Sequence, residues 1–105
     1  MAWLILLLAG LLEIVWAIAL KQSEGFSRLW PSVVGVGAAV LSFLLLTVAL
    51  RELPAGTGYA VWVGIGAVGV AIAGVILLGE AVSPARVMFL AVIVTGIVGL
   101  RIVEG

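Results

Sequence analysis

A lone glutamate interrupts the first apolar stretch of this sequence. Glu13 is the only ionisable residue in the run 2–20, and a charged side chain near the centre of a bilayer costs at least about 2.5 kcal/mol. A cost of that size favours a functional role, such as binding an ion or a proton. The alternative is a structural role, in which a protonated Glu13 ties two helices together by a hydrogen bond.

The residues about one helical turn from Glu13 suit a cation site. Gly10 and Ala17 lie at i−3 and i+4, on the same helical face, and leave space beside the carboxylate. Trp16, at i+3, offers an indole N–H donor and an aromatic face. Carboxylates and aromatic faces both attract cations. The sequence therefore indicates a cation-binding face on the first helix.

Residues from two later apolar stretches are predicted to complete this site. Ser42 is expected at about the depth of Glu13, where its hydroxyl would donate either to the carboxylate or to its own helix four residues back. Tyr59 and Trp62 are three residues apart, so they share one helical face. Trp62 is too deep to be an interfacial anchor, whereas an interfacial aromatic belt would also explain Tyr59.

A carboxylate in these surroundings would bind a cation in competition with protons. A planar cation such as guanidinium can form two parallel hydrogen bonds with a carboxylate. Apolar surroundings favour the neutral form of a carboxyl group, which brings protonation into competition with cation binding. Such competition couples the release of one ligand to the binding of the other. If two Glu13 carboxylates face one another in a dimer, up to two protons would exchange for each cation.

The composition places these residues in a membrane protein. Hydrophobic residues make up 66% of the 105 residues and charged residues 10%, against about 45–50% and 25% in soluble domains. Because backbone groups in lipid must be hydrogen-bonded internally, we predict an all-α membrane protein with a single four-helix transmembrane domain over 1–105. The segments of spanning length are about 2–20, 32–50, 57–78 and 85–103.

Several kinds of site are disfavoured by the composition. The sequence has no Cys, which removes disulfides and thiol chemistry, and no His, which is the commonest metal ligand. The formal net charge is zero, and no basic cluster suggests a nucleic-acid partner. We therefore expect no metal, no cofactor, no nucleic acid and no catalytic residues, as for a transporter that is not an enzyme.

Glycines and other small residues indicate close packing in the last two stretches. Residues 64–69 spell G-x-G-x-x-G, but no strand precedes them as a dinucleotide site requires. Gly64, Gly66 and Gly69 instead indicate a hinge in the third helix or, as the alternative, tight packing alone. Small residues of the fourth stretch predict a helix–helix interface, either between protomers or within the chain. They are Ala91, Thr95, Gly96 and Gly99.

Positive charges are spread almost evenly over the two ends of the predicted bundle. Arg51 and Arg101 lie at one end, and Lys21, Arg28 and Arg86 at the other. A difference of one residue is too small for the positive-inside rule to select an orientation. Either the orientation is weakly specified, or both orientations are made and needed. The second interpretation gives a dimer with its two-fold axis in the membrane plane, related to the inverted repeats of many transporters.

The sequence resembles the small multidrug resistance family over essentially its whole length. The shared features are four spans, the lone Glu13, residues 25–29 (GFSRL) before Pro31-Ser32, and residues 59–62 (YAVW). Within that family it is most similar to the guanidinium exporter subtype. The similarity lies in residues 10–17 (GLLEIVWA), 53–69 and 78–80 (LGE). Exporters of polyaromatic cations in the same family usually carry a small residue where Trp16 stands.

The resemblance implies an antiparallel, dual-topology homodimer that exchanges protons for cations across the bacterial inner membrane. Glu13 would be the carboxylate shared by protons and substrate. Trp16 and Ser42 would hydrogen-bond to it and orient it. Trp62 would line the site, and Tyr59 would switch between its two openings. The implied partners are guanidinium, small substituted guanidines, protons and the lipid bilayer. Export of hydrophobic or quaternary ammonium cations, and a non-transporting role as a membrane assembly subunit, stay open as alternatives.

Overall fold

The computed structural model describes the backbone of residues 1–104 and the side chains of residues 1–103. Four helices follow one another along the chain: α1 (Ala2–Gln22), α2 (Leu29–Ala49), α3 (Ala55–Leu78) and α4 (Pro84–Glu104). The described residues contain no strand, so the predicted all-α class is confirmed. All four helices are long and apolar enough to cross a membrane, since about 20 residues span a hydrocarbon core of about 30 Å.

Prolines and a glycine account for several helix ends. α2 begins at Leu29, earlier than the predicted start at residue 32. Pro31 is tolerated in the first turn, because the backbone N–H groups there have no partner within the helix. α3 begins directly after Pro54 and ends before Gly79, whose φ of 68° is the left-handed conformation that often terminates helices. α4 begins at Pro84, which suits a helix start because its φ is already helical.

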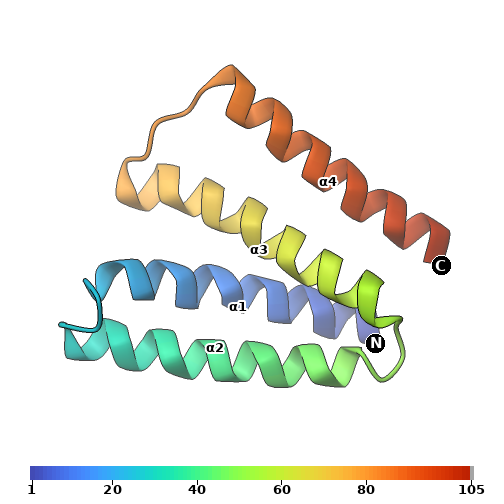
Figure 1. The fold of residues 1–105 in the computed structure, drawn as a ribbon, viewed down its shortest axis with the longest axis horizontal. Coiled ribbons are helices and arrows are strands. Elements are labelled where there is room, and N and C mark those ends of the chain that lie inside the picture. Colours follow the sequence, from blue (N-terminus) through green and yellow to red (C-terminus); the bar gives the residue numbers. More distant parts are fainter. Residues whose placement is uncertain (105) are drawn as a thin grey trace.

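α1 lies between α2 and α3, while α4 packs along α3 (Figure 1). Near its end α4 also reaches α1, where the Arg101 guanidinium lies 5.1 Å from the centre of the Trp3 ring. The start of α1 and the end of α4 lie at the same end of the bundle (Figure 1). The buried apolar cluster forms where α1, α2 and α3 meet, and none of the described residues of α4 is buried. The cluster consists of Leu6, Ala9, Leu46, Ala49, Val61 and Trp62.

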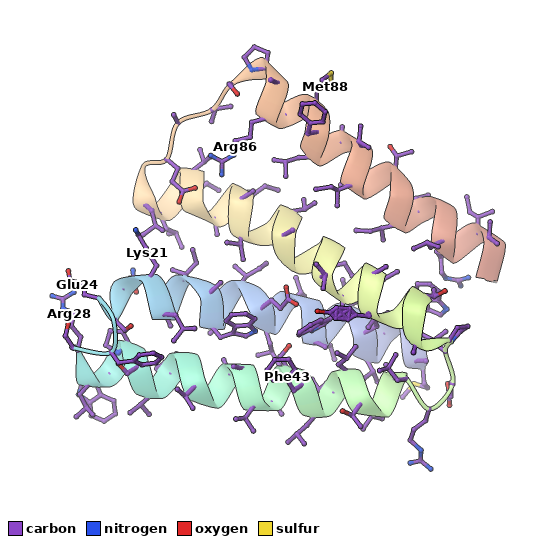
Figure 2. All side chains as sticks on the ribbon, viewed as in Figure 1. Lys21, Glu24, Arg28, Phe43, Arg86 and Met88 are labelled. Atoms are coloured by element: carbon purple, nitrogen blue, oxygen red, sulfur yellow. The ribbon has the colours of Figure 1, made fainter. Side chains whose placement is uncertain are left out.

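Charged side chains gather at the ends of the helices. Figure 2 shows Lys21, Glu24 and Arg28 at the turn that joins α1 to α2. Arg86, at the start of α4, forms a 3.0 Å ion pair with Glu80 in the loop that follows α3. Among the described residues, Glu13 is the only charged residue in the middle of a helix, so its surroundings form the candidate site.

Candidate functional site

Glu13 lies in the middle of α1, and 8% of its surface is exposed. Its carboxyl group approaches the backbone of Gly66 on α3. It forms no hydrogen bond with another residue in the part of the chain that the structure describes. A carboxyl group has up to four acceptor positions, so its oxygens are free to bind a proton or a cation from outside the chain.

Hydrogen bonds join three helices one turn before Glu13. Ser42 Oγ of α2 donates to the Ala9 carbonyl oxygen of α1 at 2.7 Å, and Trp62 Nε1 of α3 donates to Ser42 Oγ at 3.0 Å. In an α-helix the N–H group of Glu13 donates to the carbonyl four residues before it, which is this same Ala9 carbonyl. The Ser42 hydroxyl therefore bonds to the backbone of α1, and to neither of the two acceptors considered from the sequence.

The aromatic residues of α3 form a cluster beside this network. Tyr59 and Trp62 share a face of α3, with ring centroids 5.6 Å apart in an edge-to-face arrangement. Phe43 of α2 contacts the same indole, with ring centroids 5.3 Å apart. Trp62 is buried, whereas Tyr59 is 52% exposed and lies at the open side of the cluster. Sequence reasoning missed Phe43, whose position directly after Ser42 was the one available indication.

The neighbours of Glu13 on α1 differ from the predicted arrangement. Gly10 does not leave open space beside the carboxylate, because Ile65 of α3 fills that space. Trp16 makes no hydrogen bond to Glu13, and its buried indole N–H has no partner among the described residues. An unpaired buried donor costs about 1–3 kcal/mol. An acceptor supplied by a ligand or by a second protomer would remove that cost.

The glycines of α3 allow other helices to approach closely. Gly64 lies against Ile97 of α4, Gly69 lies against Ile14 of α1, and Gly66 faces the glutamate carboxyl group. α3 is one continuous helix through all three positions. Close packing is thus observed at each glycine, while a hinge function stays a prediction.

The row of small residues on α4 points away from the other helices. A Cβ atom built on Gly96 or Gly99 would have no neighbouring atom within 4 Å. Ala91 and Thr95 are exposed, and the Thr95 hydroxyl donates to the Ala91 carbonyl of its own helix at 2.8 Å. These residues do not pack against the rest of the described chain, which favours the interpretation as an interface between protomers.

Known proteins resemble this chain over nearly all its length. A model of the family described as "Small Multidrug Resistance protein" matches residues 1–93. Proteins named "Guanidinium exporter" from Salmonella typhimurium strain LT2 and Escherichia coli strain K12 are each 58% identical over 102 residues. One from Citrobacter freundii, with the same name, is 57% identical. Each alignment covers 97% of both chains. The chain is a multi-pass protein of the bacterial inner membrane and belongs to the Small Multidrug Resistance family.

Proposed function

We propose that this protein exports guanidinium in exchange for protons, and that Glu13 binds both. The observation that carries this proposal is a carboxyl group in the middle of a membrane-spanning helix, 8% exposed and without a hydrogen bond to the described residues. The names of relatives that are 57–58% identical support guanidinium as the substrate. Transport of this kind requires no covalent step, so we expect no enzymatic activity.

In this proposal Glu13 alternates between two bound ligands. The ionised carboxylate accepts two parallel hydrogen bonds from the planar guanidinium ion. Protonation removes the negative charge and with it most of the attraction for the cation. Release of guanidinium on one side of the membrane is thereby coupled to the arrival of a proton. Small substituted guanidines that keep two N–H groups on one edge would bind in the same way.

Aromatic side chains would contribute to cation binding beside the carboxylate. Ring faces attract cations by about 0.5–2 kcal/mol, more strongly when water is excluded. Trp62 is held by its hydrogen bond to Ser42, so its ring has a fixed position. Tyr59 is exposed and contacts the Trp62 ring. A change in the position of Tyr59 would alter access to the site, as expected for a residue that switches between two openings.

The assembly in this proposal is a dual-topology homodimer. The uncovered small residues of α4, the unpaired Trp16 indole and the even distribution of positive charge all support a second copy of the chain. Two copies in opposite orientations give a two-fold axis in the membrane plane, so that inward-open and outward-open states are equivalent. Labelling of tags at the C-terminus should find both membrane faces occupied. Labelling of one face alone would contradict dual topology.

Transport by the purified protein in liposomes tests the substrate. With an acidic interior and a neutral exterior, we expect radiolabelled guanidinium to accumulate inside as protons leave. Excess methylguanidine should compete, and liposomes without protein provide the background. Accumulation of tetraphenylphosphonium without any accumulation of guanidinium would contradict the proposal and favour export of hydrophobic cations.

A further inference from the structure

The carboxyl group of Glu13 occupies the space that a side chain at Gly66 would fill. A Cβ atom built on Gly66 would overlap this carboxyl group and would lie 2.9 Å from the Cβ atom of Glu13. Carbon atoms pack at about 3.5–4.0 Å. Any other residue at this position would therefore turn the carboxyl group away or push α1 and α3 apart.

The two neighbouring glycines of α3 face different groups. A Cβ atom on Gly64 would lie 2.8 Å from Cδ1 of Ile97, and one on Gly69 would overlap the end of the Ile14 side chain. At both positions the obstacles closer than 3.4 Å are Cδ1 and Cγ1 of an isoleucine, which lie beyond its Cβ atom and move when the side chain adopts another staggered rotamer. Within the described structure, Gly66 is thus the member of this group that touches the ionisable side chain.

The position of the Glu13 carboxyl group affects its binding of both ligands. Contact with the α3 backbone decides how much water reaches the group, and proton binding depends on that access. The direction of its two oxygens decides whether a planar cation can pair with both of them. A displacement of about 1 Å is enough to change binding and rates substantially.

We infer that Gly66 is a positioning residue, whose missing side chain seats the Glu13 carboxyl group against α3 in the geometry where protons and guanidinium compete. This inference rests on the proposed role of Glu13 and gives Gly66 a function that a hinge does not require. A hinge depends on backbone flexibility, so substitution at any of the three glycines would slow the conformational change. Positioning depends on the absence of one Cβ atom, so substitution at Gly66 alone would change the pH dependence.

The experiment compares Gly66→Ala with the matched variants Gly64→Ala and Gly69→Ala in proteoliposomes. Initial rates of guanidinium uptake are measured against pH and against guanidinium concentration. For Gly66→Ala we expect the midpoint of the pH profile to move by about 0.5–1 unit and the half-saturating concentration to rise about tenfold. The two control variants should keep the wild-type midpoint, whatever their maximal rates. A wild-type midpoint in Gly66→Ala, or equal shifts in all three variants, would overturn the inference.

A second substitution covers the case in which Gly66→Ala does not fold. Glu13→Asp shortens the overlapping side chain by one methylene group, so it should restore folded protein and part of the transport when combined with Gly66→Ala. If the double variant is no better than Gly66→Ala alone, the inference is wrong. Glu13→Gln, measured alongside, separates the two proposals. If Glu13→Gln loses transport while Gly66→Ala keeps the wild-type pH profile, only the role of Gly66 is rejected.

Discussion

The Ser42 hydroxyl donates a 2.7 Å hydrogen bond to the carbonyl oxygen of Ala9, and this bond joins α2 to α1 one turn before the buried glutamate. The same hydroxyl accepts a hydrogen bond from the Trp62 indole of α3. Ser42 is completely buried, so water does not compete for these bonds. One small polar side chain thereby links the three helices that surround the proposed cation site.

Replacing Ser42 with Ala should therefore destabilise the protein. The substitution leaves the buried Trp62 N–H without its acceptor, which costs about 1–3 kcal/mol. Thermal unfolding in detergent, followed by circular dichroism, should show a lower midpoint. The matched control is Thr47→Val on the same helix, which removes an exposed hydroxyl that bonds only to the Phe43 carbonyl. That change should stay within about 0.5 kcal/mol of wild type, and equal losses in both variants would contradict the role of Ser42.

Guanidinium binding should weaken as the pH falls. Protonation of Glu13 removes the charge that attracts the cation, so protons compete with guanidinium for one group. Below the pH at which Glu13 titrates, the apparent dissociation constant should rise about tenfold per pH unit for one competing proton, and about a hundredfold for two. Tryptophan fluorescence titrations at a series of pH values measure this slope, because two indoles lie near the site. An affinity that is constant from about pH 5 to about pH 9 would contradict competition at a carboxylate.

A bulky residue in the small-residue row of α4 should weaken the dimer without disturbing the protomer. A side chain at Gly96 would meet no atom of its own chain within 4 Å, but it would crowd a partner that packs there. Overpacking costs about 1–3 kcal/mol, so Gly96→Leu should raise the dissociation constant roughly tenfold in a cross-linking assay. Gly37→Leu is the control, since Gly37 of α2 is also exposed and open. Equal effects of both variants would argue against an interface at α4.

The ion pair between Glu80 and Arg86 should contribute little to stability. Its atoms are 3.0 Å apart, but the side chains are 43% and 33% exposed, so water and salt screen their attraction. Arg86 also donates to the Ala81 carbonyl at 3.0 Å, and Figure 2 shows it near the loop between α3 and α4. A double-mutant cycle with Glu80→Gln and Arg86→Gln should give a coupling of about 0.2–1 kcal/mol that falls at high salt. A larger coupling that is insensitive to salt would show that the pair is shielded in the assembled protein.

Features that follow from one helix could be predicted from the sequence. The depth of Glu13 depends on counting residues in an apolar run, and the shared face of Tyr59 and Trp62 follows from their spacing. The four spans follow from composition and length. The same rules predict an interface at the small residues around Gly96, and this stays a prediction because no partner chain is present beside them.

Features that join two helices could not be predicted in the same way. The acceptor of Ser42 depends on how far α2 is shifted along α1, and a shift of one turn would present a different carbonyl. The contact of Gly66 with Glu13 depends on the rotation of α3, for which the glycine pattern is equally compatible with a hinge. Trp16 was expected to orient the carboxylate, yet a single protomer leaves its N–H unpaired.

The central claim is that one carboxyl group carries both ligands, and guanidinium uptake by Glu13→Gln tests it most directly. The measurement uses proteoliposomes with an acidic interior, with the same amount of folded dimer for each variant, and Glu13→Asp as the variant that keeps a carboxylate. We predict that wild type and, at a lower rate, Glu13→Asp accumulate guanidinium, whereas Glu13→Gln does not exceed protein-free liposomes. Accumulation by Glu13→Gln at the wild-type rate, with the wild-type dependence on pH, would contradict the account.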